Sequence, residues 1–335
     1  MRAAVIRNAG GGVQLEERER PTPGPDEVLI RIHACGVCHG DLMVRDGHFP
    51  FARYPIVPGH EITGTVEATG ERVRTPTRGA RVGVSALFSS CGVCPQCIGA
   101  DEFLCSKLEF TGVTKDGGFQ EYMLAPAAYV APLPDELDFA DAAPLTCAGL
   151  TVYSGMRHAG FRPGNKVAVI GLGGLGHMAV LFAKAMGGQV AVLSTSADKE
   201  REAYGLGAER FIDVKNANPA EALKEWGGGA DLILATAPDA ETMAAAFPGL
   251  AANGTMMVLG FPFAPICLSP VDLVMGRRRL MGSPAGSRKD LRDTLAFAAA
   301  HGLRPSVKRV PLQDLASSFG EMDKGHMRGR TVVVM

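Results

Sequence analysis

Residues 166–176 read KVAVIGLGGLG, and this stretch decides the fold. Its first five residues have the pattern of a short buried strand, and residues 175–186 continue beyond the glycines as an amphipathic helix. Glycines permit the tight turn and the close backbone approach that place a pyrophosphate on the helix N-terminus, where free N–H groups favour negative charge. Strand, turn and helix in this order favour a dinucleotide site over a merely structural turn. The residues that we expect to bind the cofactor here are Gly171, Gly173, Gly174, Leu175 and Gly176.

Strand-like and helix-like segments alternate after this turn. Residues 190–193 and 232–235 have strand patterns, residues 198–206 have a helical pattern, and residues 258–260 resemble a later strand. Such alternation is typical of βαβ units around a parallel sheet.

The first 150 residues differ in texture, with short β-type runs such as 28–32 broken by glycine and proline turns. A chain of 335 residues also exceeds the roughly 250 to 300 at which single cores stop growing. A helix is expected at 288–301, and a final β-type run at 331–334 is expected to return to the first domain. The sequence predicts two domains, one of residues 1–148 with 283–335, the other of residues 149–282.

Composition narrows the class of ligand. The chain has 34 Lys and Arg residues against 35 Asp and Glu, so it lacks the excess of positive charge typical of proteins that bind nucleic acid or an acidic membrane. The chain shows no signal peptide and no apolar run long enough to span a membrane. We expect a cytoplasmic protein with a small-molecule substrate, in which eight cysteines are better explained as metal ligands or reactive thiols than as disulfides.

The strand at 189–193 should end near the cofactor ribose, where an NAD enzyme usually carries a carboxylate. This chain has hydroxyl side chains there instead, and together with a lysine that follows them they can bind a 2′-phosphate. The neighbouring Asp198, or a simple helix cap, is the alternative explanation of this run. The sequence favours NADP(H) over NAD(H), with contacts from Ser194, Thr195, Ser196 and Lys199.

Four cysteines, Cys91, Cys94, Cys97 and Cys105, lie within one short loop. Four thiolates fill a tetrahedral Zn²⁺ and leave no open position, so this spacing predicts a structural zinc. A redox switch is the alternative. A zinc-ribbon nucleic-acid module is disfavoured because Lys107 is the one basic residue between 88 and 110.

A catalytic zinc needs three protein ligands and one open position. Cys38, His60 and Cys147 can supply a Cys₂His set. Their separation in sequence makes the spacing alone a weak argument, since His60 can be an ordinary polar residue and Cys147 a core thiol.

Taken together, these motifs make the chain resemble the zinc-dependent medium-chain alcohol dehydrogenases, and within them the cinnamyl alcohol dehydrogenase-like branch. The resemblance rests on motifs in register along the whole chain: CGVCH at 35–39, GHE at 59–61, the four-cysteine loop, Cys147 ahead of GLT at 149–151, the glycine turn and the STS tip at 194–196. It implies an α/β protein with a GroES-like, mostly β catalytic domain and a Rossmann doubly wound parallel-sheet domain.

The resemblance also implies roles for single residues. Cys38, His60 and Cys147 would bind the catalytic zinc, Glu61 would be a nearby carboxylate able to reach it, and Asp41 would orient His60. Each chain would then hold two Zn²⁺, one catalytic and one structural.

Further implied features lie around this centre. His39 and Arg330 would face the cofactor pyrophosphate, although a solvated surface side chain is the alternative for each. Cys35 forms a Cys-x-x-Cys with Cys38, and a rival assignment would make it a ligand or redox partner, but it stands where the family ordinarily has no ligand. A homodimer or homotetramer is expected, with residues 270–280 at the contact. Phe49, Phe51, Phe88 and Phe110 are expected near the substrate pocket or in the core.

The chain departs from the family at two positions. Alcohol-oxidising members usually carry Ser or Thr two residues after the first zinc cysteine, and many carry a histidine three residues after that; this chain has Gly40 and Met43. Neither can relay a proton, which would have to pass through water, His48, Glu61 or another donor. We expect an NADP-dependent alcohol dehydrogenase or carbonyl reductase. The alternatives are a zinc-retaining reductase of imines or activated C=C bonds and a non-catalytic NADP-binding protein.

Overall fold

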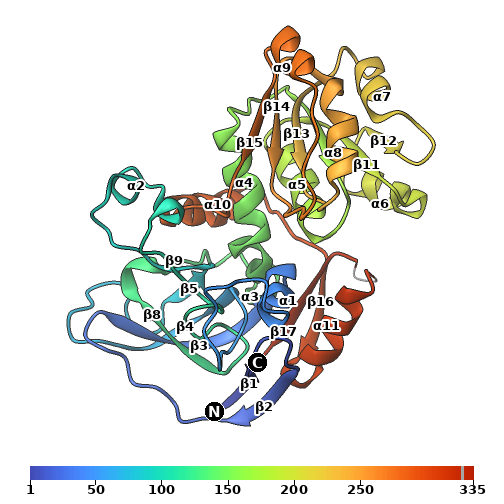
Figure 1. Cartoon of the computed structure of the whole chain (residues 1–335). Coiled ribbons are helices and arrows are strands. Elements are labelled where there is room, and N and C mark those ends of the chain that lie inside the picture. Colours follow the sequence, from blue (N-terminus) through green and yellow to red (C-terminus); the bar gives the residue numbers. More distant parts are fainter. Residues whose placement is uncertain (326–327) are drawn as a thin grey trace. The chain divides into compact units, whose positions relative to one another are not determined.

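The computed structural model describes residues 1–325 and 328–335 (Figure 1). The chain divides into two compact units, one of Met1–Leu150 with Gly286–Met335 and the other of Thr151–Ala285. In the described part of the chain, no helix has both the length and the apolar character needed to cross a membrane.

The unit Thr151–Ala285 is built on a six-stranded parallel sheet in the order β12-β11-β10-β13-β14-β15. Counted from β10, this is the doubly wound order 3-2-1-4-5-6, whose direction of winding reverses between β10 and β13. The predicted Rossmann fold is therefore confirmed. Its strands are β10 (Lys166–Ile170), β11 (Gln189–Ser194), β12 (Arg210–Asp213), β13 (Ala230–Ala235), β14 (Leu250–Val258) and β15 (Arg279–Gly282).

Helices alternate with these strands along the chain (Figure 1), and α7 and α8 contribute Leu223 and Met243 to the core of this unit. The helices are α4 (Ala148–His158), α5 (Gly174–Ala185), α6 (Glu200–Gly205), α7 (Pro219–Glu225), α8 (Ala240–Ala246) and α9 (Pro270–Gly276), with 3₁₀ turns η4 (Ala197–Lys199) and η5 (Phe247–Gly249). The structure differs from two expectations. The helix expected at 198–206 begins with the 3₁₀ turn η4, and of the strand expected at 258–260 only Val258 is in a strand, as the last residue of β14. Beyond that residue, the N–H groups of Leu259 and Gly260 turn back to the carbonyl of Ala235.

The other unit is mostly β, as expected. Seven strands form one sheet in the order β16-β17-β3-β4-β5-β9, with β8 also paired to β3. They are β3 (Glu27–Gly36), β4 (Glu61–Thr69), β5 (Arg81–Val84), β8 (Tyr122–Pro126), β9 (Ala131–Pro132), β16 (Val307–Pro311) and β17 (Arg330–Val334). The ribbons β1 (Arg2–Ile6) with β2 (Val13–Glu17) and β6 (Leu87–Ser89) with β7 (Glu109–Phe110) complete the β structure. The final strand does return, since β17 pairs antiparallel with β3.

Helices also belong to this unit, and α1 carries several of the site residues. The helices are α1 (His39–Arg45), α2 (Pro95–Ile98), α3 (Phe139–Ala142), α10 (Arg288–Ala300) and α11 (Leu315–Asp323), with the 3₁₀ turns η1 (Glu102–Leu104), η2 (Ala127–Tyr129), η3 (Ala143–Thr146) and η6 (Leu312–Asp314). Helix α10 begins at a capping box of Ser287 and Asp290 and ends just before Gly302, as its sequence predicts. The core beneath the sheet includes Ile30, Ile62 and Phe119.

Candidate functional site

Four residues from three separate segments converge in the mostly β unit. Cys38 caps the N-terminus of α1, His60 and Glu61 stand at the start of β4, and Cys147 follows η3. The potential ligand atoms of Cys38, His60, Glu61 and Cys147 all lie within 4.8 Å of one another. Two sulfurs, an imidazole nitrogen and a carboxylate are donors that suit Zn²⁺.

Asp41 holds this cluster in position through three hydrogen bonds. Its Oδ1 accepts from Nδ1 of His60 at 3.0 Å and from the N–H of Gly59 at 3.1 Å, and its Oδ2 accepts from the N–H of Cys38 at 2.9 Å. A carboxylate can only accept, so Nδ1 of His60 carries a proton and Nε2 is the nitrogen left for Cys38 or a metal. Asp41 is fully buried, so water does not compete for these bonds.

The two thiols of the cluster affect one another. A hydrogen bond from the Cys147 thiol lowers the pKa of Cys38 well below its usual range, and the same bond raises the pKa of Cys147. Burial lowers the pKa of His60, but the charges of Asp41 and Cys38 outweigh burial and hold it well above the usual value. Cys38 is therefore the thiol of the pair that more readily becomes a thiolate, the form that binds a metal.

Glu61 forms a buried ion pair with Arg330. One guanidinium nitrogen of Arg330 donates to Oε1 of Glu61 and, at 3.2 Å, to the carbonyl of Val37. The other carboxylate oxygen, Oε2, is buried and has no hydrogen-bond partner among the described residues. Burial raises the pKa of Glu61 to about 7, although Arg330 acts in the opposite direction. Glu61 thus keeps one oxygen available for a cation or a proton.

Two glycines make room around the cluster. A Cβ atom at Gly36 would lie 2.0 Å from Oε2 of Glu61, so any side chain there would displace the carboxylate. A Cβ at Gly40 would lie 3.0 Å from Cε1 of His60 and 4.0 Å from Sγ of Cys38. The position at which the family carries a hydroxyl is thus directly beside the proposed ligands, and here it has none. Met43, the second departure, is buried.

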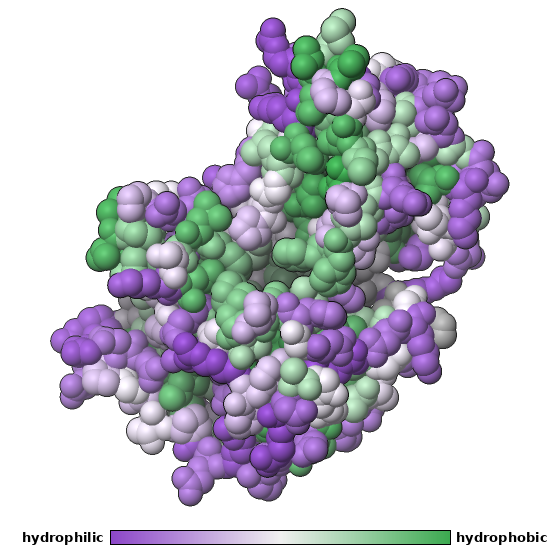
Figure 2. All heavy atoms as spheres, viewed as in Figure 1, coloured by the Kyte–Doolittle hydropathy of each residue, from purple (hydrophilic) through white to green (hydrophobic). Residues whose placement is uncertain are grey.

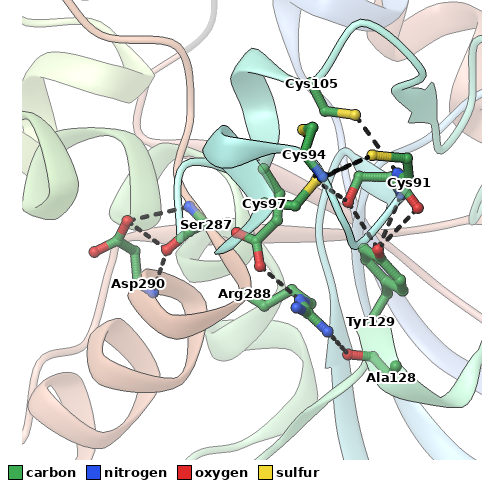
Figure 3. Close-up of polar contacts among 11 residues, drawn as sticks. Cys91, Cys94, Cys97, Cys105, Ala128, Tyr129, Ser287, Arg288 and Asp290 are labelled. Atoms are coloured by element: carbon green, nitrogen blue, oxygen red, sulfur yellow. Dashed lines mark hydrogen bonds and ion pairs between the residues drawn. The ribbon is translucent and has the colours of Figure 1, made fainter. Parts of the chain in front are cut away.

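The four cysteines of the loop also converge, and Figure 3 shows their side chains pointing toward one another. The Sγ of Cys97 lies 3.8 Å from that of Cys91 and 3.5 Å from that of Cys94. Sulfurs bound to one tetrahedral Zn²⁺ at about 2.3 Å stand about 3.8 Å apart, so this set fits the ion.

Hydrogen bonds toward these sulfurs favour their charged form. Backbone N–H groups of Cys94 and Cys91 point at the sulfurs of Cys91 and Cys105, at 3.4 and 3.5 Å. The N–H of Val93 is the largest of several influences that lower the pKa of Cys91 to about 6. A hydrogen bond from Ser90 is the largest influence that lowers the pKa of Cys97. The Cys97 N–H lowers the pKa of Cys94, but burial and hydrogen bonds with the neighbouring thiols outweigh it and raise that pKa to about 11. Cys91 and Cys97 are thus the thiols of the loop that more readily become thiolates.

The glycines of the turn are required for different reasons. Gly171 has φ +87°, which favours glycine, and a Cβ at Gly176 would lie 2.0 Å from the carbonyl oxygen of Gly171. A Cβ at Gly173, the N-cap of α5, would meet nothing within 4 Å. Gly174 and Leu175 open the helix, so the turn brings α5 close to the strand and leaves space at its N-terminus, where a pyrophosphate would bind.

The expected ribose contacts stand at the carboxyl end of β11. Ser194 is buried, and its Oγ accepts from the N–H of Ser196 at 3.1 Å. Thr195 is exposed, and Lys199 ends η4 with its side chain half-buried. These residues form one polar tip with no carboxylate on the strand itself.

Other expected residues lie as follows. His39 is exposed at the first position of α1, whereas Arg330 is buried against Glu61, a contact that the sequence did not predict. Phe51 stacks on Phe110 with ring centroids 5.2 Å apart and lies 5.4 Å from Phe49. Phe88 is buried beneath the Lys115 ammonium. The pyrophosphate and pocket roles of these residues stay predictions.

Two family models match the chain. The alcohol dehydrogenase GroES-like domain matches residues 24–135, and the zinc-binding dehydrogenase model matches residues 174–300. The first covers both Cys38 and the four-cysteine loop, and the second begins within the glycine turn.

Whole-chain relatives agree with these matches. An alcohol dehydrogenase of Moraxella sp. strain TAE123 is 40% identical over 334 residues, covering 99% of each protein. A solved cinnamyl alcohol dehydrogenase from Sorghum bicolor superposes with a TM-score of 0.91 at 34% identity, over 99% of this chain and 97% of that one. CAD from Helicobacter pylori, complexed with NADP(H), superposes with a TM-score of 0.90 at 28% identity, over 100% and 97% of the chains.

Proposed function

This chain belongs to the zinc-dependent medium-chain alcohol dehydrogenase family, and from that premise we propose that it moves a hydride between NADP(H) and an alcohol or the matching aldehyde or ketone. Its relatives make it an oxidoreductase that acts on small molecules. The observation that carries the finer proposal is the convergence of Cys38, His60, Glu61 and Cys147 within 4.8 Å. Three of these can bind a metal and leave one position open for substrate.

We propose two zinc ions per chain, one on Cys38, His60 and Cys147 and one on the four-cysteine loop. The first ion, when bound, would act as a Lewis acid on a substrate oxygen. Asp41 keeps the His60 proton on Nδ1 and so orients Nε2. Glu61, with its pKa at about 7, can take up or release a proton at Oε2.

The preference for NADP(H) is proposed from the tip of β11. A carboxylate at Ser194 would repel a 2′-phosphate, whereas hydroxyls with Lys199 nearby can bind it. The NADP(H) complex of the Helicobacter pylori relative supports the same choice. In this proposal the glycine turn binds the pyrophosphate, and His39 and Arg330 add positive charge.

Gly40 favours a second candidate function. Because a hydroxyl is missing beside His60, the ordinary route for an alcohol proton is interrupted at that position. A zinc-retaining NADPH reductase of imines or activated C=C bonds does not need that route, since its proton goes to nitrogen or carbon.

Cofactor oxidation by the purified chain distinguishes these candidates. NADPH and NADH consumption is followed with aldehydes, ketones, cyclic imines and enones, alongside zinc content by elemental analysis. NADPH-specific turnover of aldehydes or ketones with two zincs per chain is the expected result. Turnover confined to imines or enones would replace the first proposal by the second, and inactivity with a single zinc would favour a non-catalytic NADP-binding protein.

We propose that copies of the chain associate through α9 and β15. Figure 2 shows hydrophobic side chains gathered over α9 in the upper part of the view, and β15 is the last strand of its sheet. Val271, Val274 and Met275 are 66%, 75% and 82% exposed. Self-association would cover this surface, and light scattering after size exclusion should give a dimer or tetramer that Met275→Lys weakens.

A further inference from the structure

Ser90 lies directly before the first cysteine of the loop and contacts the third. Its Oγ is 3.1 Å from Sγ of Cys97 and 2.8 Å from the hydroxyl of Tyr129. Tyr129 belongs to η2, which follows the loop in sequence, and Figure 3 shows its ring beside the cysteines. The sulfur, the serine and the phenol therefore form one continuous chain of contacts.

The direction of these hydrogen bonds follows from counting protons. A metal-bound thiolate has no proton, so the Ser90 hydroxyl must donate to Cys97. The Ser90 oxygen then accepts from the Tyr129 hydroxyl, and the Tyr129 oxygen accepts from the backbone N–H of Ser90 at 3.0 Å. With a thiolate at Cys97, each hydroxyl donates once and the bonds run from Tyr129 through Ser90 to the sulfur; with a protonated Cys97 the Tyr129 hydroxyl would turn to the carbonyl of Ser90, 3.3 Å away.

Arg288, the first residue of α10, holds Tyr129 from its other side (Figure 3). Its guanidinium carbon stands 4.8 Å from the Tyr129 ring centroid, and its Nε donates to Oε1 of Glu102 at 2.7 Å. Glu102 is 2% exposed and lies between the third and fourth cysteines. Arg288 therefore ties the phenol and the cysteine loop to the same helix.

We propose that Ser90 is a positioning residue of the four-cysteine loop, and that its hydrogen bond to Cys97, fixed by Tyr129 and Arg288, slows the release of zinc from this site. The proposal rests on the second zinc of the proposed function. Donors to a ligand atom orient it and reduce its tendency to take up a proton, and their removal typically costs 10- to 100-fold in metal affinity.

The test measures zinc release at this loop rather than activity. The zinc-loaded full chain is mixed with excess chelator and an alkylating agent, and alkylation of the peptide carrying Cys91, Cys94 and Cys97 is followed by mass spectrometry. Ser90→Ala and Tyr129→Phe should each raise the chelator-dependent labelling rate by about 10- to 100-fold. Ser90→Thr, which keeps the hydroxyl, should restore a rate near that of the unaltered chain.

Matched controls separate this role from a general loosening. Ser89→Ala removes the neighbouring hydroxyl, which donates to Glu109. Tyr122→Phe alters another ring that lies under a guanidinium, that of Arg20 at 4.2 Å. Both should label at the unaltered rate, and the Ser90→Ala, Tyr129→Phe double variant should label no faster than Ser90→Ala alone.

The outcomes are distinguishable. Equal rates for Ser90→Ala and Ser89→Ala, or additive effects in the double variant, would overturn the positioning role while leaving the second zinc intact. If the unaltered chain is labelled equally fast with and without chelator, the loop holds no zinc, and the second zinc and this inference both fail.

Discussion

The Oδ1 atom of Asp41 lies 3.0 Å from Nδ1 of His60, and this contact decides which imidazole nitrogen is left to bind a metal. Because the carboxylate is buried, it holds the ring in one tautomer and one orientation.

Asp41→Asn should weaken zinc binding at Cys38, His60 and Cys147 by about 10- to 100-fold, because the amide lacks the charge that stabilises the Nδ1–H group. Zinc content after dialysis against graded chelator concentrations measures this. Asp46→Asn, at the other end of α1 in an ion pair with Arg45, is the control and should retain full zinc. Equal retention by both variants would remove the orienting role from Asp41.

Breaking the buried ion pair between Glu61 and Arg330 should lower the stability of the protein. Arg330→Met would leave a buried carboxylate without its partner, which typically costs about 3–5 kcal/mol. Urea unfolding of the metal-loaded chain should show this, and adding Glu61→Gln should recover part of it. Arg309→Met, which breaks exposed ion pairs with Asp138 and Asp141, should cost less than about 1 kcal/mol. A loss of cofactor affinity without loss of stability would instead indicate that Arg330 acts mainly on the pyrophosphate.

Cofactor choice can be altered at the tip of β11. Ser194→Asp places a carboxylate where it would repel a 2′-phosphate and bind the free ribose diol. The ratio of kcat/KM for NADPH to that for NADH should fall roughly tenfold or more, since about 1.4 kcal/mol is a factor of ten. Ser194→Ala, which removes the hydroxyl without adding charge, should change the ratio less. An unchanged ratio for Ser194→Asp would place the discrimination at other residues.

Gly40 offers a test of the missing proton route. Gly40→Ser adds a hydroxyl beside His60, and Gly40→Ala adds the same Cβ, 3.0 Å from Cε1 of His60, without a hydroxyl. Alcohol oxidation by the serine variant should exceed that by the alanine variant by up to about 10²-fold, the lower end of general acid–base assistance. Equal rates for the two variants would show that the proton leaves by another path.

His33 predicts a pH dependence of stability. Burial is the main cause that lowers its pKa, and its ring stacks on Phe139 at 4.3 Å. The unfolded chain therefore binds more protons than the folded chain below about pH 6.5, so the stabilisation is complete above that pH and is lost as pH falls through the lower folded pKa. Melting temperatures between pH 5 and 8 should fall more on acidification for the unaltered chain than for His33→Gln. Parallel curves would exclude His33 as the source, because zinc loss affects both proteins alike.

The sequence predicts those parts of the architecture that depend on residues close together in the chain. The order of strand, glycine turn and helix at 166–186 depends on neighbouring residues, and the four-cysteine loop keeps its ligands within 15 residues of chain. The helices that no sequence pattern predicts include α1, α2, α3, α4, α7, α8, α9 and α11. Among them, α7, α8 and α9 are seven residues long, too short for a 3.6-residue period to stand out.

The contacts that the sequence missed join residues far apart along the chain. Glu61 meets Arg330, and Tyr129 meets Arg288, through pairings that no local period encodes. The glutamate was expected near the metal and the arginine near the pyrophosphate, yet their mutual ion pair appears only when β17 lies against β3.

That pairing of β17 with β3 also bears on how the protein is made. Val332 lies opposite Gly36, so β3 leaves the ribosome roughly 300 residues before its partner, a wait of about 15 to 60 s at ordinary translation speeds. The unit Thr151–Ala285, which is continuous in sequence, is synthesised whole within that interval. Synthesis therefore lets the middle of the chain fold first, while the unit of Met1–Leu150 with Gly286–Met335 waits for its last strand.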